Sequence, residues 1–528
     1  MKISISTSPD RVFTTLNPGL RRIGTICPPV NLKARPFRPC DHWTLGCETL
    51  DRDFADYDQY KEYLAPLGLR QIRLQAGWAK CERVRGAYDF AWLDHIVDDA
   101  RVRGLDPVLE TGYGNPIYSG GGGFDLGAGF PVSDEGLSAW DAWVDAITRH
   151  FAGRVGEWFM WNEPDITPSD GSAPKTPQQI AAFNVRTARI VKRNIPGARI
   201  AGLSLARNRA EFLEECIRAL GADATLFDWF IYHGYQEAPE ASYENVEAQK
   251  EVVARLAPHA RLRQGENGAP SEMTTFFALK RKAWSEVSQA KWDLRRMLGD
   301  IGHGVESSIF TICDFNHVGR EINRKGLLRA DEEHRVIAVK RAYYAVQNLA
   351  SVFSALPCAA LCSVSGTEVP GSVPGAVCSV PGAEAPGSCA PLLQPTSLRS
   401  VDLSLSAYAF HADSQAQPCA MAFWSHGRDF IDPALAVGSR GLPAPAPDER
   451  ILRYERPGDS FETRPAVFED YSCEPLRDPV WVDLLSGRVY DFPAERVVPC
   501  RSCVRYLDVP VYDSPCLLAE REAIPFAP

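Results

Sequence analysis

The chain has 528 residues, of which 45% are hydrophobic and 23% charged, proportions that are ordinary for a globular protein with a sizeable core. Its formal net charge of −10 and its lack of a long basic cluster argue against a nucleic-acid partner, because a phosphate backbone requires a basic face. No run approaches the roughly 18 apolar residues needed to cross a bilayer, and the N-terminus lacks an apolar signal core, so we expect a cytoplasmic protein without a membrane partner.

Eight strand-like segments follow one another in the first two thirds of the chain. Amphipathic stretches with apolar residues at helical spacing separate several of them, including 57–67, 90–103, 138–151, 177–194 and 210–220. Strict alternation of strand and helix is typical of a parallel α/β fold, and eight such units close a (β/α)8 TIM barrel. The eight segments are 43–48, 71–75, 106–111, 157–162, 199–205, 227–232, 262–266 and 308–313.

A doubly wound open sheet is the alternative architecture for such a pattern. It would require a glycine-rich phosphate turn after the first strand, whereas that strand here runs into Cys47, Glu48, Thr49 and Leu50. The barrel is therefore the preferred prediction.

The composition changes after the barrel, which we expect to span residues 41–353 and to end in a helix over 336–353. Residues 354–400 contain a repeating tract rich in Pro, Gly and Ser that cannot bury a core, and we interpret it as a flexible insertion. Short β-rich segments in 401–528 predict an antiparallel β-sandwich domain, which strands in 1–40 could join.

The most informative stretch is GEWFMWNEPD, at residues 156–165. Its run of large apolar side chains predicts a strand buried on both faces, and Pro164 ends that strand because it has no N–H to donate. Asn162 and Glu163 therefore lie at the carboxyl end of the fourth strand, which is where TIM barrels place their catalytic groups.

The same rule collects further polar and aromatic residues from the ends of other strands. We predict a polar mouth lined by aromatic residues, with candidate binding residues Arg73, Trp78, Glu110, Tyr113, Asn115, His233, Tyr235 and Asp314. Simpler structural roles remain open for several of them. Trp78 and Tyr113 could pack at the rim, His233 and Tyr235 could form a core pair, and Glu110 could be an ion-pair partner.

Glu163 and Glu266 close the fourth and seventh strands, which face each other across an eight-stranded barrel. Two carboxyl groups in that position can flank a glycosidic bond, and a separation of roughly 5 to 5.5 Å would give retention of configuration. We expect hydrogen bonds from Tyr235 and Arg73 to keep Glu266 ionised, and Asn162 to bond the sugar 2-hydroxyl.

The motifs Asn162-Glu163-Pro164, His233-Gly234-Tyr235 and Glu266 resemble those of the clan A retaining glycoside hydrolases. The chain is most similar to the family 39 neighbourhood of β-xylosidases and α-L-iduronidases, which pairs a barrel with a β-sandwich. The resemblance implies that Glu163 is the acid/base and Glu266 the nucleophile.

These observations predict a retaining glycosidase that cleaves a small oligosaccharide or glycoside by double displacement, with xylosidase-like, exo-acting cleavage as one form. We expect no metal and no organic cofactor, and the sequence leaves a homo-oligomer open. A carbohydrate-binding barrel without catalysis is the alternative, although such a protein could discard either glutamate. A metal-dependent hydrolase is a third possibility, but we find no suitable ligand spacing.

Overall fold

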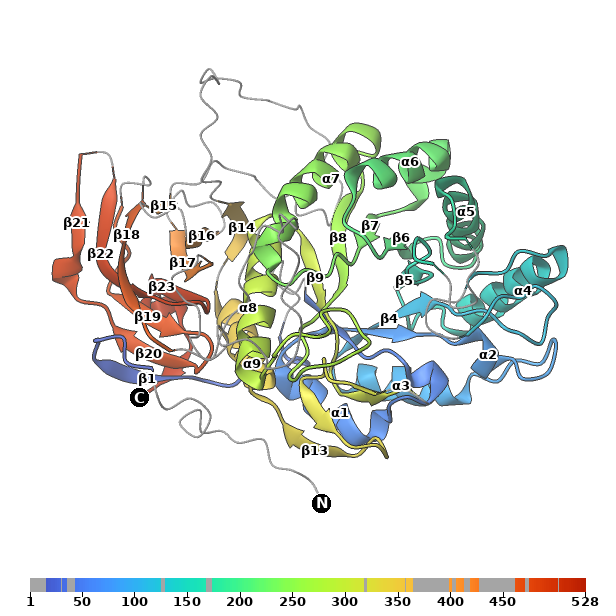
Figure 1. Ribbon diagram of the computed structural model, residues 1–528, viewed down its shortest axis with the longest axis horizontal. Coiled ribbons are helices and arrows are strands. Elements are labelled where there is room, and N and C mark those ends of the chain that lie inside the picture. The colour runs from blue at the N-terminus through green and yellow to red at the C-terminus, as the bar shows by residue number, and fades with distance from the viewer. Residues whose placement is uncertain are drawn as a thin grey trace.

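The computed structural model describes residues 16–29, 31–35, 43–124, 129–167, 173–317, 321–356, 358–363, 398–400, 405–412, 418–426, 461–470, 474–501 and 503–528. Figure 1 shows a barrel surrounded by helices beside a second body made of strands. Within the described residues, no helix combines the length and the apolar character needed to span a bilayer.

Eight parallel strands form a closed barrel in which each strand pairs with its neighbours in chain order. This confirms the predicted (β/α)8 architecture and excludes the open doubly wound sheet. The barrel strands are β2 (Trp43–Gly46), β3 (Gln71–Gln75), β4 (Asp106–Thr111), β5 (Glu157–Met160), β6 (Arg199–Leu205), β7 (Trp229–Tyr232), β8 (Arg261–Asn267) and β9 (Glu306–Ile309).

Helices surround the barrel and occupy the expected places between its strands. One of them, α5, begins with a capping box in which Thr176 and Gln179 satisfy each other's backbone N–H groups. The helices are α1 (Tyr57–Leu67), α2 (Trp78–Cys81), α3 (Ala91–Val102), α4 (Asp134–His150), α5 (Pro177–Asn194), α6 (Ala210–Leu220), α7 (Tyr243–Leu256), α8 (Glu286–Gly302) and α9 (Arg341–Ala355). The 3-10 turns are η2 (Leu50–Arg52), η3 (Gly221–Leu226), η4 (Pro239–Ser242), η6 (Ala494–Arg496) and η7 (Arg521–Ala523).

The last helix begins later than the sequence suggested. Residues Val336–Val339 form β13, which pairs with β12 (Leu328–Ala330), and α9 starts at Arg341. The β-branched residues of β13 fit an antiparallel ladder, which explains why tertiary pairing overrides the helical pattern there. Another short pair, β10 (Phe315–Asn316) and β11 (Ile322–Asn323), also follows β9.

Strand β5 is buried on both faces, as predicted for a strand of a parallel barrel. Phe159 belongs to a small cluster with residues of β4, β6 and β7, whereas Trp158 and Met160 belong to the large core shared with the helices. Alternate side chains of the strand therefore pack inside the barrel and against its outer helices. This packing fixes the position of the chain at the point where Glu163 emerges.

Among the described residues, two antiparallel sheets form the second body, which is the predicted C-terminal β-sandwich. One sheet has the order β14 (Cys358–Ser363), β16 (Leu405–Ala412), β17 (Pro418–Ser425), β23 (Cys516–Glu520), β19 (Pro479–Asp483), β20 (Arg488–Asp491), β1 (Arg22–Ile26) and β24 (Phe526–Ala527). The other has the order β15 (Leu398–Ser400), β18 (Arg464–Asp470), β22 (Val504–Val511) and β21 (Val497–Pro499).

Both ends of the chain contribute to the larger sheet. Figure 1 shows the N-terminal strand β1 beside the C-terminal strand β20, and the two pair in antiparallel register with Thr25 opposite Arg488. Two pieces of the expected flexible insertion are also strands, namely β14 and β15. The rest of that tract, residues 364–397, lies outside the described residues.

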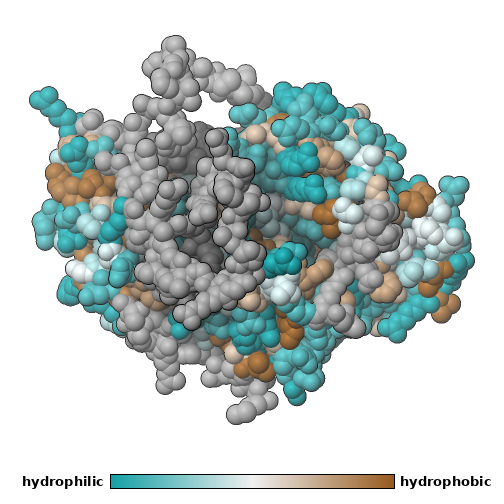
Figure 2. All heavy atoms as spheres, viewed as in Figure 1, coloured by the Kyte–Doolittle hydropathy of each residue, from teal (hydrophilic) through white to brown (hydrophobic). Residues whose placement is uncertain are grey.

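Helices α8 and α9 lie on the side of the barrel that faces the sandwich (Figure 1). Lys291 of α8 forms a buried ion pair with Asp513 of the sandwich, at an Nζ–Oδ1 distance of 2.6 Å. Trp424 of β17 donates its indole N–H to Glu240, which also binds Arg295 of α8. The face shown in Figure 2 is mostly hydrophilic where its residues are coloured, with hydrophobic residues in small separate groups.

Candidate active site

Glu163 follows β5 at the carboxyl end of the barrel. Its backbone has a φ of 48°, in the left-handed region that residues with side chains rarely adopt. The Glu163 N–H donates at 2.9 Å to the carbonyl of Ser204, which lies in the neighbouring strand β6. Backbone strain of this kind persists only when the surroundings hold it in place, and it concentrates at functional sites.

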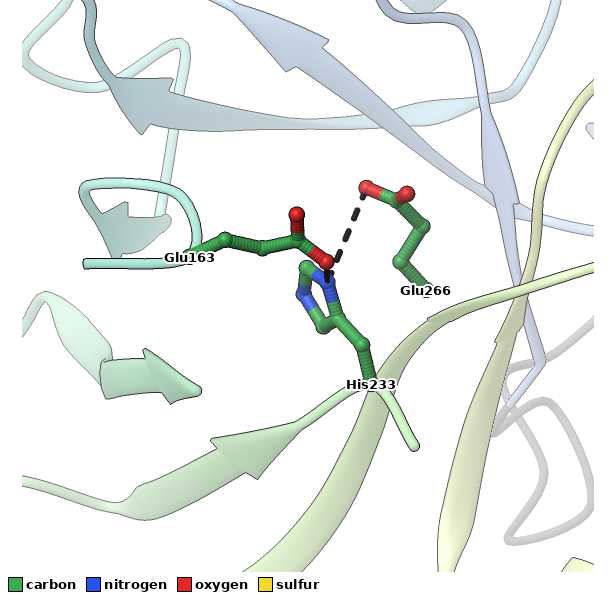
Figure 3. A group of neighbouring side chains, drawn as sticks. All are labelled: Glu163, His233 and Glu266. Atoms are coloured by element: carbon green, nitrogen blue, oxygen red, sulfur yellow. Dashed lines mark hydrogen bonds and ion pairs between the residues drawn. The ribbon is translucent and has the colours of Figure 1, made fainter. Parts of the chain in front are cut away.

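Glu266 belongs to β8, and its carboxylate meets that of Glu163 across the barrel mouth. One oxygen of each carboxylate and one ring nitrogen of His233 all lie within 4.8 Å of one another. Figure 3 shows these three side chains turned toward each other from separate elements of the barrel. The Nδ1 atom of His233 lies 2.9 Å from Glu163 Oε1 and 3.9 Å from Glu266 Oε2.

Glu266 receives two further hydrogen bonds, both of which the sequence analysis expected. Arg73 Nη2 donates to Oε2 at 2.6 Å, and the Tyr235 hydroxyl donates to Oε1 at 3.0 Å. Burial by itself would raise the pKa of Glu266, but the positive charges of His233 and Arg73 and the two hydrogen bonds outweigh it. The pKa of Glu266 is therefore lowered, and its carboxylate stays ionised at neutral pH.

The arginine that binds Glu266, Arg73, is buried and contacts two further carboxyl groups. Arg73 has no exposed side-chain surface, and its guanidinium also binds Glu48 and Glu110. Burial raises the pKa of Glu110 to about 7, with Arg73 opposing that rise and Glu266 and Glu48 adding to it. Gln75 donates to the other oxygen of Glu110 at 3.0 Å. Arg73 and Glu110 are fully buried beneath Glu266 and do not line the cavity, so they do not contact substrate as we expected.

His233 is completely buried, and its Nδ1 shares a hydrogen bond with Glu163 Oε1. Burial opposes its protonation, but the charge of Glu266 and the hydrogen bond with Glu163 outweigh burial and raise the pKa of the imidazole. The ring therefore holds a proton to higher pH than an ordinary histidine.

Asn162 and Tyr113 join the site from neighbouring strands. Asn162 Nδ2 donates to the Tyr113 hydroxyl at 2.9 Å, whereas Asn162 Oδ1 is buried and has no hydrogen-bond partner within the described part of the chain. An unsatisfied buried acceptor is costly, so this oxygen is suited to accept a hydrogen bond from a ligand.

The two glutamates open into a cavity of about 270 Å³, which we call the catalytic cavity. Asn162, Tyr113, Tyr235 and the strand-end residue Gln75 also line it. The sequence analysis missed other lining residues, namely Glu48, Arg52, Phe276, Phe277, Phe310, Phe315, His317 and Lys325. Burial lowers the pKa of Lys325 to about 7, although Glu266 opposes this change.

A sequence signal for some of these residues did exist. Glu48 and Gln75 lie at the carboxyl ends of the first two strands, where the rule that found Glu163 also applies. Phe277 and Lys325 lie in long connections after β8 and β9, and no pattern in the sequence places such residues over the mouth.

Besides Arg73, Glu110 and His233, three more of the predicted binding residues do not line the catalytic cavity. Trp78 is fully buried at the start of α2, where it stacks on Tyr118 with ring centroids 5.6 Å apart, so it cannot serve as a sugar platform. Asp314 is also fully buried, and it binds Lys340 Nζ at 2.6 Å as an internal ion pair. Asn115 borders a neighbouring hollow, where its amide donates to the carbonyl of Glu82.

The trio of Glu163, His233 and Glu266 has the spacing of a metal site. A metal would require a neutral imidazole, whereas the raised pKa of His233 favours the protonated ring. The guanidinium of Arg73 also pairs with Glu266. The donor set therefore fits proton transfer between acidic groups better than coordination of a cation.

Comparisons with known proteins agree with this architecture. No protein-family model matches the sequence. The curated beta-galactosidase BgaA of Clostridium cellulovorans is 31% identical over 77 residues, which are 14% of this chain and only 10% of that protein's length.

The solved structures cover far more of the chain. A family 39 glycoside hydrolase from Bacteroides cellulosilyticus aligns with 94% of this chain and 83% of its own, with a TM-score of 0.59 and 14% identity. A monomeric beta-xylosidase from Caulobacter crescentus covers 94% of this chain and 100% of its own, with a TM-score of 0.51 and 15% identity. The GH39 enzyme from Xanthomonas axonopodis pv. citri covers 94% and 97%, with a TM-score of 0.50 and 17% identity.

Proposed function

Because the chain has the fold of family 39 glycoside hydrolases, we propose that it is a retaining glycoside hydrolase in which Glu163 is the acid/base and Glu266 the nucleophile. One observation carries this proposal. One carboxylate oxygen of Glu163 lies within 4.8 Å of one carboxylate oxygen of Glu266. Retaining enzymes hold their carboxyl groups about 5 to 5.5 Å apart, whereas inverting enzymes need roughly 6.5 to 9.5 Å to admit a water molecule.

In the first step, Glu266 attacks the anomeric carbon while Glu163 gives its proton to the departing glycosidic oxygen. The bond between the anomeric carbon and that oxygen breaks, and a covalent glycosyl ester on Glu266 forms. In the second step, Glu163 takes a proton from water, whose oxygen attacks the anomeric carbon and releases Glu266. Two inversions at one carbon give net retention.

The surroundings of each glutamate suit these roles. Arg73 and Tyr235 stabilise the ionised form of Glu266, which is the form that attacks. His233, which holds a proton through its raised pKa, shares a hydrogen bond with Glu163 Oε1. This hydrogen bond orients the Glu163 carboxyl, and Glu163 is the member of the pair that borders the cavity.

Asn162 has the free acceptor that a sugar hydroxyl would satisfy. We assign its Oδ1 to the 2-hydroxyl, because that contact strengthens as positive charge develops at the anomeric carbon. Aromatic side chains such as Phe277 and Phe315 give the cavity apolar walls that suit the C–H faces of a sugar ring.

The cavity volume of about 270 Å³ is slightly below the range of roughly 300 to 1,000 Å³ for pockets that hold whole drug-sized ligands. It therefore suits one sugar unit of a small oligosaccharide or glycoside. This size favours exo action, with a β-xyloside as the first substrate to test.

The deciding experiment follows the anomeric proton by NMR during hydrolysis of a panel of nitrophenyl glycosides that includes β-xylosides, α-arabinosides and β-galactosides. We expect the sugar released first to have the same anomeric configuration as the substrate. Release of the opposite anomer would contradict the double displacement. Binding of these sugars without any hydrolysis would instead support a carbohydrate-binding protein.

A further inference from the structure

Asp165 directly follows the Asn-Glu-Pro motif at residues 162–164, and the proposed reaction gives it no role. It is buried in the loop after β5. Its Oδ1 accepts the backbone N–H of Ala206 at 2.7 Å, and its Oδ2 accepts that of Arg207 at 3.3 Å. Charge-assisted hydrogen bonds from backbone N–H groups to a carboxylate are roughly twice as strong as those between neutral groups. Asp165 therefore fastens the loop after β5 to the segment that follows β6.

This anchor lies only two residues from the proposed acid/base. Pro164 has a fixed φ, so few free rotations separate Asp165 from Glu163. The backbone N–H of Glu163 also donates to the carbonyl of Ser204 in β6. Glu163 and Ser204 have φ values of 48° and 40°, in the left-handed region that persists only where surrounding contacts hold it. Asp165 supplies two such contacts at this junction.

The segment that Asp165 holds also binds the backbone of His233. The carbonyls of Leu205 and Ala206 accept the N–H groups of His233, at 2.8 Å, and of the residue after it, at 3.0 Å. The His233 Nδ1 atom in turn lies 2.9 Å from Glu163 Oε1 (Figure 3). Asp165 and His233 are thus fastened to adjacent residues of one short segment, which sets how the Glu163 carboxyl meets the imidazole.

We propose that Asp165 is a positioning residue of the reaction. By accepting both N–H groups with its two oxygens, it holds the Glu163 carboxyl against His233 and in place to protonate the glycosidic oxygen. This role rests on the proposed hydrolase function. Asp165 does not line the catalytic cavity, so it acts through Glu163 and not on the substrate. An aspartate has the two acceptors that the role requires, whereas the amide of an asparagine has one.

The first test measures kcat/KM for Asp165→Ala on glycosides whose leaving groups differ in acidity. Where the leaving group needs a proton, we expect a loss of roughly 10- to 100-fold, because a misplacement of 1 Å can cost that much in rate. With dinitrophenol as the leaving group, we expect a clearly smaller loss. An equal loss on all leaving groups, or no loss in the folded variant, would overturn the proposal.

A conservative variant keeps the test decisive if Asp165→Ala folds poorly. Asp165→Asn has nearly the same shape and can still accept the N–H of Ala206, but its amide nitrogen cannot accept that of Arg207. We expect the same dependence on the leaving group, with a smaller loss than in Asp165→Ala. Wild-type rates on every leaving group would overturn the proposal, because the second oxygen would then have no positioning role.

Asp228→Ala is the matched control. The Oδ2 atom of Asp228 accepts the backbone N–H of Ile200 at 2.8 Å, near the start of β6 and therefore at the opposite end of that strand. The variant loses the same kind of contact with the same strand, but far from Glu163. We expect any loss of activity to be equal on all leaving groups. A leaving-group dependence like that of Asp165→Ala would overturn the specific role of Asp165.

A titration separates this inference from the proposed chemistry. Burial opposes protonation of His233, but the charge of Glu266 and the hydrogen bond with Glu163 raise the pKa of its ring. NMR of the protein with ¹⁵N-labelled histidine follows this pKa, and His233→Gln identifies the signal by its absence. In Asp165→Ala, we expect the pKa of His233 to fall toward its value in Glu163→Ala, whereas Asp228→Ala should leave it in place.

An unchanged pKa of His233 in Asp165→Ala would refute the positioning role. If the wild-type protein hydrolyses none of the glycosides, the proposed function fails, but the titration still decides whether Asp165 holds Glu163 against His233.

Discussion

Arg73 donates a 2.6 Å hydrogen bond from Nη2 to Glu266 Oε2, although 193 positions separate the two residues in the sequence. The same buried guanidinium binds Glu48 and Glu110, so three carboxyl groups share one cation at the base of the catalytic cavity. This arrangement fixes the orientation of Glu266 and its charge together.

Removing that cation should damage the fold. Arg73→Met would leave three buried carboxylates without their counter-ion, and breaking a buried pair costs ~3–5 kcal/mol. We expect the free energy of unfolding in urea to fall by at least that amount. The control is Arg186→Met, which removes a partly exposed pair with Asp141 and should cost about 1 kcal/mol or less. Similar losses in both variants would contradict the structural role of Arg73.

The pH profile should respond to Tyr235. Its hydroxyl donates to the ionised carboxylate of Glu266 and so contributes to the lowered pKa of that group. In Tyr235→Phe the pKa of Glu266 should rise. As the pH is lowered, Glu266 then becomes protonated at a higher pH than in the wild-type protein, and activity is lost there.

A hydrogen bond to a charged group is worth ~1.5–3 kcal/mol, and one pKa unit corresponds to ~1.4 kcal/mol. We therefore expect the acidic limb of kcat/KM to move upward by about one pH unit. Tyr88→Phe, which alters a tyrosine outside the catalytic cavity, should leave that limb in place. An acidic limb at the wild-type pH in Tyr235→Phe would argue against Glu266 as the group that titrates there.

Replacing the proposed nucleophile should create space for an external one. Glu266→Gly should abolish turnover of an activated glycoside while the sugar still binds. Azide, a small anion, should restore part of the activity by attacking the anomeric carbon directly, and the product should be the glycosyl azide of inverted configuration. Formation of the retained azide would contradict the assignment of Glu266.

Loss of the proposed acid/base should depend on the leaving group. Glu163→Ala should lower kcat/KM by about 10²- to 10⁴-fold on substrates whose leaving group needs a proton. Substrates with an acidic leaving group, such as dinitrophenol, should be affected far less in the glycosylation step. A uniform loss across leaving groups, measured by initial rates over a graded phenol series, would exclude this role.

Trp78 was predicted to bind substrate, but the structure places it in the core. Its indole donates to Glu82 Oε2 at 2.6 Å and packs against Tyr118, Trp140 and Trp143. Trp78→Phe should therefore lower the free energy of unfolding by ~1–3 kcal/mol with little change in KM. A raised KM with unchanged stability would return Trp78 to the substrate site.

The positions of the strands were predictable because burial on both faces leaves a strong pattern. Strand β3 and helices α1, α5 and α6 have the predicted bounds, because β3 alternates apolar with polar residues and the helices repeat apolar residues at helical spacing. The β13 strand was not predicted as a strand, because its sequence continues the helical pattern of α9 and only its pairing with β12 decides between them.

The candidate site was predictable only where it follows from strand order. Glu163 and Glu266 close predicted strands, and the barrel brings such ends together. Lys325 and Phe277 lie in connections whose course depends on packing, so their place in the catalytic cavity could not be read from the sequence. Asp314 has the same sequence signature as a site residue, but its contact with Lys340 makes it part of the interior.

The amino-acid sequence by itself determined the barrel, the sandwich and the identity of the two facing glutamates, because hydrophobic periodicity and strand order are properties of the chain. Only the tertiary structure decided which polar groups surround Glu266, that Trp78 belongs to the core, and that Arg52 lines the catalytic cavity. Those outcomes depend on side-chain packing between residues far apart in the sequence. They also depend on the need of buried charged groups to find partners of opposite charge.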